Sequence, residues 1–344
     1  MTLRAYVISR ILLTIPMIFI LLTMVFVVIR ILPGDPVLAH FEKNVDPQLV
    51  EEMRVKLGLD KPLWAQYFDY FFGVLRGDLG KSMYDYSPVA EQIFSAFPAT
   101  LELAVFSMMI AVLVGIFLGV QASKRYNKPV DHTIRIFGIV TYAIPVFLLG
   151  MILQLVLGVG LRWLPIGLRM NPILTAPQGL TIGGLHFSTG LYTIDSLLEG
   201  NIFKFVESVR YLFLPSLTLG TVLSGVFIRL TRTNMFETMR LDFVTAARAR
   251  GLRETTVTYR YALRNAFLPV LTMIGLQFAT LLAGAVLTET TFSWPGLGTY
   301  VVDRINFRDY TAIQGAVVVF GILVSIVSLV VDLLYAYLDP RIRL

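Results

Sequence analysis

Residues 77–82 are the segment with the residue types of a phosphate-binding loop, in the order Gly-Asp-Leu-Gly-Lys-Ser. Such a loop needs a glycine five residues before Gly80, where this chain has Leu75. It must also join a strand to a helix, and Pro88 follows too soon for that. We therefore interpret the segment as a turn and expect no nucleotide binding there.

The sequence shows no set of residues arranged for catalysis. The chain has no cysteine, which excludes disulfides, zinc–thiolate sites and iron–sulfur clusters. Its three histidines, His40, His132 and His186, lack the spacing of metal ligands. Neither a G-x-S-x-G elbow nor an H-E-x-x-H helix occurs. We expect no enzyme activity, no cofactor and no bound metal.

The composition is that of a membrane protein. Hydrophobic residues make up 56% of the 344 residues and charged residues 15%, whereas about 25% charged residues is usual in soluble domains. The mean hydropathy is +0.72. The net charge of +6 comes from basic residues clustered in a few loops. This clustering is typical of loops on the cytoplasmic side of a membrane, and it predicts lipid rather than nucleic acid as the partner.

Six apolar segments have the length of a membrane span, about 20 residues. They predict an all-α membrane protein with six transmembrane helices. The first is followed by no small-residue cleavage site, so we interpret it as a membrane helix rather than a signal peptide. The segments are residues 11–29, 99–122, 134–161, 211–230, 267–288 and 311–338.

The loop charges set the orientation, because basic loops remain in the cytoplasm. Basic residues lie before the first span, between the second and third, between the fourth and fifth, and after the sixth. Both termini are therefore expected in the cytoplasm. The other loops, of which about 32–98 and 162–210 are long, would lie outside. Helical spacing of Leu49 and Met53 predicts an amphipathic helix in the first of these loops.

This topology divides the chain into three parts. Residues 1–31 form the N-terminal tail and first transmembrane helix, and residues 32–98 form the extracytoplasmic loop region. Residues 99–344 form a core with five transmembrane helices and a cytoplasmic loop at 231–266.

Polar side chains within the spans are few. Gln154 and Gln277 are the strongest candidates, and each could line a pore or form a hydrogen bond between helices. An ion-coupled secondary transporter would need ionisable residues at the midplane or an inverted repeat, and neither is evident.

The loop between the fourth and fifth spans carries the most informative pattern. Asp242 is suited to cap a helix, and Gly251 to end it in a left-handed conformation. Alanines between them permit a partner to approach closely, so we predict a docking helix, followed by a second helical stretch over residues 254–266. The candidate docking residues are Asp242, Phe243, Thr245, Ala246, Ala247, Arg248, Ala249 and Gly251.

This loop resembles the "EAA" loop of ATP-binding-cassette importer permeases. Ala246, Ala247 and Gly251 occupy the family's positions, and Leu268-Pro269 follows. Thr245 stands in place of the usual glutamate, as in the peptide and nickel branch of the family. Other segments resemble that branch in the same order along the chain: residues 33–36, 57–62, 77–80, 99–103, 262–266, 281–298 and 339–343.

The resemblance is to the first permease subunit of dipeptide and oligopeptide importers, and it implies the fold of a type I importer permease in the cytoplasmic (inner) membrane of a prokaryote. It also implies four kinds of partner: a second homologous permease, two cytoplasmic ATPase subunits, an extracytoplasmic binding protein, and a peptide substrate. Nickel chelates, glutathione and oligosaccharides remain alternative substrates. ATP hydrolysis would belong to the partners.

The orientation can be tested because the chain has no cysteine of its own. Single cysteines at Asp69 or Glu199 should react with an impermeant thiol reagent from outside. Those at Lys128 or Arg253 should react only from inside. Labelling of position 253 from outside would invert the topology and remove the docking interpretation.

Overall fold

The computed structural model describes residues 3–31, 37, 47–56, 58–182 and 185–338. The regular secondary structure of the described residues is helical apart from one short hairpin of strands and one isolated bridge. The motifs at residues 33–36 and 339–343 lie outside the described residues. In chain order the elements are α1 (Leu3–Ile31), α3 (Pro47–Lys56), α4 (Leu63–Leu75), α5 (Val89–Lys124), α6 (Pro129–Ala143), α7 (Val146–Leu153), η1 (Gln154–Gly160), β1 (Leu180–Ile182), β2 (Leu185–Phe187), α8 (Tyr192–Leu198), α9 (Ile202–Thr238), α10 (Asp242–Ala249), α11 (Glu254–Thr256), η2 (Val257–Ala262), α12 (Leu263–Leu282), α13 (Val286–Thr291), α14 (Leu297–Asn306) and α15 (Tyr310–Leu338).

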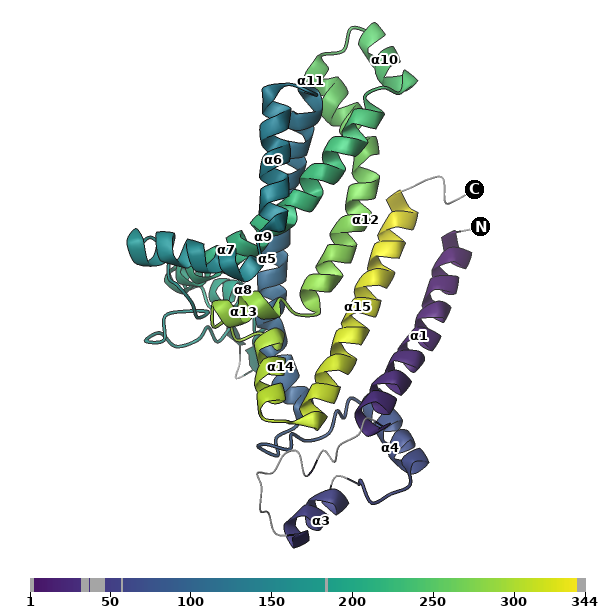
Figure 1. Ribbon diagram of the computed structural model, residues 1–344, viewed down its shortest axis with the longest axis vertical. Helices are drawn as coiled ribbons and strands as arrows, with labels where there is room; N and C mark the ends of the chain where they lie inside the picture. Colours follow the sequence, from purple (N-terminus) through teal and green to yellow (C-terminus); the bar gives the residue numbers. More distant parts are fainter. Residues whose placement is uncertain (1–2, 32–36, 38–46, 57, 183–184, 339–344) are drawn as a thin grey trace.

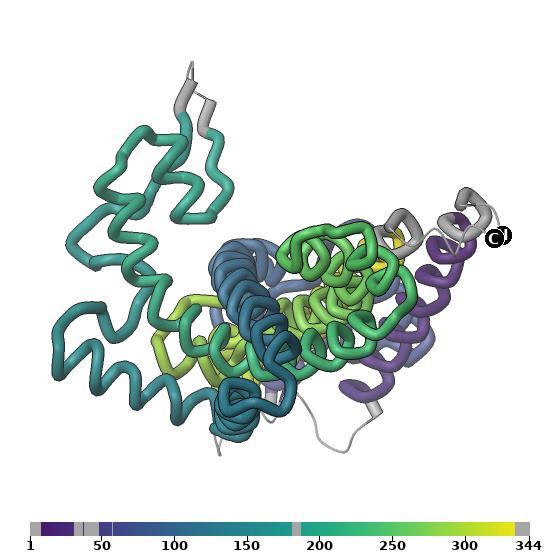
Figure 2. The backbone as a smooth tube through the Cα atoms, turned by 90° about the horizontal axis from the view of Figure 1, so that it is seen from above, coloured from purple at the N-terminus to yellow at the C-terminus, as the bar shows by residue number. Residues whose placement is uncertain are grey.

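The long helices form an elongated bundle with distinct ends. α10 and α11 protrude at one end, and α3 and α4 lie at the other (Figure 1). α1 begins, and α15 finishes, toward the end that carries α10. Viewed along the bundle, α1 lies at one edge, while α7 and the segment containing the strands project from the opposite edge (Figure 2). Among the described residues, five helices are long and apolar enough to cross a membrane, and a bent pair makes a sixth candidate.

The core is built on the close packing of α5 against α9. A Cβ atom added at Gly119 would lie 2.6 Å from Thr231 Cβ, and one at Gly220 would lie 2.7 Å from Ile110 Cβ. Small residues therefore let the two backbones approach, as is usual where membrane helices pack. Phe227 and Leu103 are fully buried in the same cluster. The pairing of Ile110 with Gly220 and of Gly119 with Thr231 shows that the two helices run in the same direction.

The predicted continuous span at 134–161 is wrong. The chain bends by 102° between α6 and the α7–η1 segment. Pro145 lacks a backbone N–H, and the preceding Ile144 is extended, with φ −73° and ψ 127°. Steric conflict with a proline disfavours a helical conformation for the residue before it. Hydropathy misses this break because the side chains on both sides of it are apolar.

The boundaries of the other spans also shift. α12 ends at Leu282 rather than near residue 288, because Gly284 has φ +115°, outside the helical region. α5 begins at Val89, inside the segment expected to be loop, and continues through Pro98. α9 extends well beyond the predicted 211–230 at both ends. These extensions are less apolar than the spans, so a hydropathy window does not detect them.

A buried ion pair attaches the segment after η1 to α5. Arg169 Nη2 lies 2.8 Å from Glu102 Oε2, and both side chains are less than a tenth exposed. Glu102 also accepts hydrogen bonds from the backbone N–H and hydroxyl of Thr193. The Arg169 guanidinium lies 3.8 Å from the centre of the Tyr192 ring. These contacts satisfy charges that would be costly to bury alone.

The segment that was compared with a phosphate-binding loop is a turn, as expected. Gly80 has φ +82°, and its N–H donates to Asp78 Oδ1 at 2.9 Å. The Ser82 hydroxyl donates to Asp309, at the start of α15. α3 is also present as predicted, but Val50 and Met53 form its buried side, while Leu49 is exposed.

Removing Arg169 should destabilise the protein, because Glu102 would remain buried without its charge partner. We expect Arg169→Met to lower the free energy of unfolding by about 3–5 kcal/mol. Lys61→Met, which breaks the exposed Lys61–Asp69 pair, should leave the unfolding midpoint close to that of the wild type, because exposed ion pairs contribute little to stability. Thermal unfolding of the detergent-solubilised protein measures both. Equal midpoints for the two variants would contradict the assignment of Arg169 as a structural anchor.

Candidate functional site

The candidate docking helix exists and lies at an exposed end of the bundle. α10 spans Asp242–Ala249 and connects α9 to the helical stretch that leads into α12 (Figure 1). The predicted capping role of Asp242 is wrong. Leu241 is the N-cap, with no side-chain cap, and Asp242 lies in the first turn. There its carboxylate favours the helix through the helix dipole instead.

Gly251 ends α10 in the predicted left-handed conformation. Its φ is +74°, and its N–H donates to the carbonyl of Arg248 at 2.9 Å. No atom lies within 4 Å of a Cβ added there. Glycine is therefore required by the backbone angle and not by crowding.

One side of α10 packs against the chain itself. Val244 and Ala247 are buried, and they lie three residues apart, on the same face of the helix. They contact Met235 of α9 and Val257 of η2. The close contact predicted for Ala247 is therefore made inside this subunit. A small side chain at 247 keeps α10 close to the rest of the bundle.

The other side of α10 has no partner among the described residues. Leu241 is 50% exposed and Phe243 is 36% exposed. Thr245, Ala246 and Ala249 are exposed as well. Small and apolar side chains at a helix surface suit contact with another protein, because little desolvation opposes it. These five residues, together with the exposed Asp242, form the free side of α10, which we call the docking face.

An ion pair closes the turn after α10. Arg248 Nη2 lies 2.8 Å from Glu254 Oε1. This hydrogen-bonded pair raises the pKa of Arg248 above its usual value. The pair is exposed, so its main effect is to orient the turn rather than to stabilise the fold.

Aromatic side chains beneath α10 were missed in the sequence. Tyr126 stacks on Phe236 with ring centres 4.0 Å apart. The Arg240 guanidinium lies 3.9 Å from the Phe236 ring, at the spacing i, i+4 of a helix. The Arg232 guanidinium binds Asp131 through two hydrogen bonds of 2.6 and 2.7 Å. In the sequence, only the i, i+4 spacing of Phe236 and Arg240 could have indicated the contact between this ring and the guanidinium.

The chain between α11 and α12 is a π-helix. η2 spans Val257–Ala262, with Val257, Thr258 and Ala262 buried. The stretch predicted at 254–266 is helical, but its wider turn was not foreseen. Single-turn π-helices are frequent at functional sites. Here η2 positions α10 through the contact of Val257 with Val244.

The two candidate pore residues differ. Gln154 donates from Nε2 to the carbonyls of Ile166 at 2.6 Å and Thr291 at 3.0 Å. This bonding supports the alternative of a structural link, because it joins the start of η1 to two other segments. Gln277 is half-buried on α12. Pore lining by either residue remains a prediction.

Several membrane-length helices, with a protruding helix at one end, define a multi-spanning membrane protein. A model of the family "Binding-protein-dependent transport system inner membrane component" matches residues 111–344, and a model of this family's N-terminal region matches residues 3–104. The chain belongs to this family. It is a multi-pass protein of the inner membrane and the permease component of an ATP-binding-cassette importer, not the ATPase.

Relatives are similar over nearly the whole chain. The di/tripeptide transport system permease DppB of Pseudomonas aeruginosa is 41% identical over 340 residues. The dipeptide transport system permease DppB of Escherichia coli K12 is 39% identical over 339 residues. The glutathione transport system permease GsiC of Salmonella choleraesuis is 37% identical over 338 residues. Each comparison covers 98% of both chains.

The two faces of α10 predict opposite outcomes for two alanine substitutions. Ala247→Glu should lower the free energy of unfolding by at least about 2 kcal/mol, because overpacking alone costs ~1–3 kcal/mol and the carboxylate would be buried. Ala249→Glu should change it by less than about 0.5 kcal/mol, since exposed substitutions are tolerated. Thermal unfolding in detergent compares them. Equal stability of the two variants would show that α10 does not pack as described.

Proposed function

We propose that this chain is one of two pore-forming subunits of an importer that carries dipeptides or short oligopeptides into the cell. In this proposal the chain crosses the membrane six times, with α6 and α7–η1 together making the third crossing, and both termini and α10 lie in the cytoplasm. The partners are a second homologous permease, two ATPase subunits and an extracytoplasmic binding protein. Near-full-length identity to peptide permeases supports this proposal.

In this proposal the docking face binds a cleft of an ATPase subunit. The single observation that carries the assignment is that α10 is fixed on one side and free on the other. Val244 and Ala247 hold it to the bundle, while Phe243 and Ala246 are exposed. A helix held in this way transmits movement of a partner to the helices behind it.

The mechanism is a pore with two states. ATP draws the ATPase subunits together and moves α10 with them. Because α10 is packed on α9 and η2, α9 and α12 then tilt. The pore changes from inward-facing to outward-facing and receives substrate from the binding protein. Loops at 32–98 and 291–310 contact the binding protein, which supplies the selectivity.

The peptide substrate is proposed from the relatives. Two of the permeases compared above are named for di- or tripeptides, and one for glutathione, which is itself a modified tripeptide. Nickel chelates and oligosaccharides are further alternatives. Measuring the uptake of a labelled dipeptide with glutathione as competitor distinguishes a dipeptide importer from a glutathione importer.

A strained Gly251 should uncouple the importer. Gly251→Val places a β-branched side chain at φ +74°, at a cost of roughly 1–2 kcal/mol or more. The strain should misdirect α10 and reduce both peptide uptake and peptide-stimulated ATP hydrolysis in the reconstituted complex. Gly200→Val is the matched control, because Gly200 has φ +72° and equally open surroundings.

Gly200→Val introduces the same backbone strain before the start of α9, far from α10. This variant should therefore retain peptide-stimulated ATP hydrolysis. Wild-type uptake and stimulation by Gly251→Val, at normal protein abundance, would require the docking role of α10 to be abandoned. Equal loss in both variants would attribute the effect to misfolding.

A further inference from the structure

Helix α4 presents three chemically different sides. Tyr67 and Phe71 face α1, and Asp69 faces a cavity. The third side is a stripe at helical spacing, which we call the aromatic ridge: Trp64, Phe68, Phe72 and Leu75. These four side chains are between 50% and 68% exposed. Large apolar side chains exposed together indicate a surface that contacts something other than water.

The contacts with α1 define how deep α4 lies. The Tyr67 hydroxyl is 2.7 Å from that of Thr23, and the Phe71 ring centre is 5.7 Å from that of Phe19. The membrane-length segment of α1 is Ile8–Arg30. Thr23 precedes Arg30 by seven residues, or about 10 Å along the helix. α4 therefore lies beside the half of this segment that ends at Arg30, within the depth of the hydrocarbon core.

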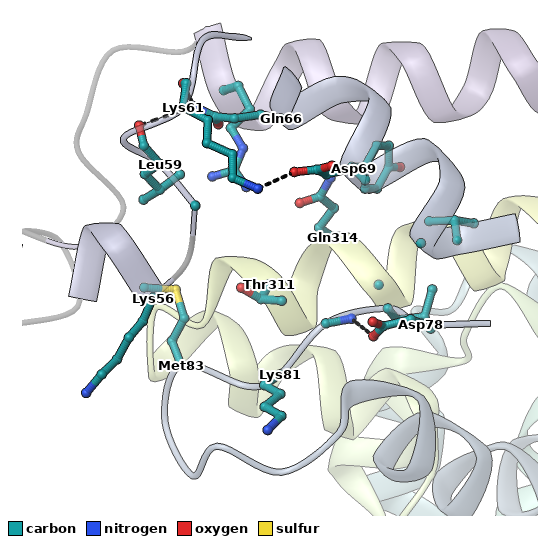
Figure 3. A pocket seen from close by; sticks show the side chains of 18 of the residues that line it. Lys56, Leu59, Lys61, Gln66, Asp69, Asp78, Lys81, Met83, Thr311 and Gln314 are labelled. Atoms are coloured by element: carbon teal, nitrogen blue, oxygen red, sulfur yellow. Dashed lines mark hydrogen bonds and ion pairs between the residues drawn. The ribbon is translucent and has the colours of Figure 1, made fainter. Parts of the chain in front are cut away.

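The polar side of α4 faces a cavity of about 450 Å³ between α4, α15 and the turn at residues 77–83. Among the residues that line it, Lys61 and Asp69 are directed toward each other and lie 2.6 Å apart (Figure 3). Gln66, Thr311 and Gln314 also line it. Ionised groups at membrane depth face water-filled cavities or one another. This arrangement places water on the cavity side and leaves the aromatic ridge on the opposite side.

We propose that α4 is inserted into one leaflet of the membrane, with its aromatic ridge among the lipid acyl chains and its Asp69 side open to an aqueous cavity. Continuity with α1 supports lipid as the occupant, because exposed apolar residues of α1 such as Met24 and Ile20 belong to the membrane span. Tryptophan and the other aromatic residues are favoured near the membrane interface. The loop region would thus be anchored in the membrane independently of any partner protein.

The proposal is independent of the transported substrate. It requires only that α1 spans the membrane. A second permease covering the ridge is the competing occupant, and a ridge in water is the third outcome. Lipid, protein and water around the ridge can be told apart, because they differ in how well an apolar and a water-soluble reagent reach a spin label there.

The test uses neighbouring positions on the same helix. Phe68→Cys and Phe72→Cys place a spin label on the ridge, and Asp69→Cys places one in the cavity. The full-length chain, in the complex in which it is purified, is reconstituted into phosphatidylethanolamine–phosphatidylglycerol vesicles. Collision with oxygen reports lipid, and collision with a water-soluble nickel chelate reports water. Met24→Cys on α1 is the lipid reference, and Lys81→Cys is the water reference.

We expect the labels at 68 and 72 to match position 24, with high oxygen accessibility and loss of accessibility to the chelate. The label at 69 should match position 81. Chelate accessibility at 68 and 72 would show the ridge to be in water. Low accessibility to both reagents would show that protein covers it. Either result overturns the proposal, and agreement of two ridge positions guards against a local effect of one label.

Discussion

The close approach of α5 and α9 is the constraint on which the other contacts depend. Glycines at 119 and 220 remove the side chains that would separate the two backbones. Dispersion contacts gain most from such proximity, since apolar surface gains little by leaving lipid for protein. α6 then packs on α9 at Gly138 and Gly225. α9 thus packs closely against both α5 and α6.

Two buried ion pairs add to this packing. At one end of the bundle, Arg232 of α9 binds Asp131 of α6, below the docking helix. Beside α8, Glu102 of α5 binds Arg169. Each pair joins segments far apart in sequence, and each is supported by further hydrogen bonds or an aromatic ring. Such pairs specify which surfaces meet, whereas apolar packing alone would tolerate sliding.

Hydropathy was sufficient to predict the helical class and most spans, because membrane length is a strong signal. The docking helix followed from Gly251, whose backbone angle only glycine adopts easily. The bend at Pro145 was missed because its surroundings are uniformly apolar. The predicted N-cap of α10 was wrong by one position, because Leu241 is the N-cap and makes no side-chain capping bond that the sequence could show. Glu102 is paired with a residue 67 positions away in the sequence, and Asp131 with one 101 positions away. Local sequence patterns do not encode such tertiary contacts.

The continuity of α9 has a thermodynamic consequence. Its 37 residues form one helix, about 55 Å long, from the arm beside α8 to the docking helix. A ligand that favours one orientation of α9 at either end shifts the same equilibrium. Coupling free energies between two binding sites are reciprocal. If an ATPase bound at α10 changed the affinity of the protein for a ligand near α8, that ligand would change the affinity for the ATPase by the same factor. If α10 binds an ATPase as proposed, a ligand bound near α8 would alter that binding without any contact between the two partners.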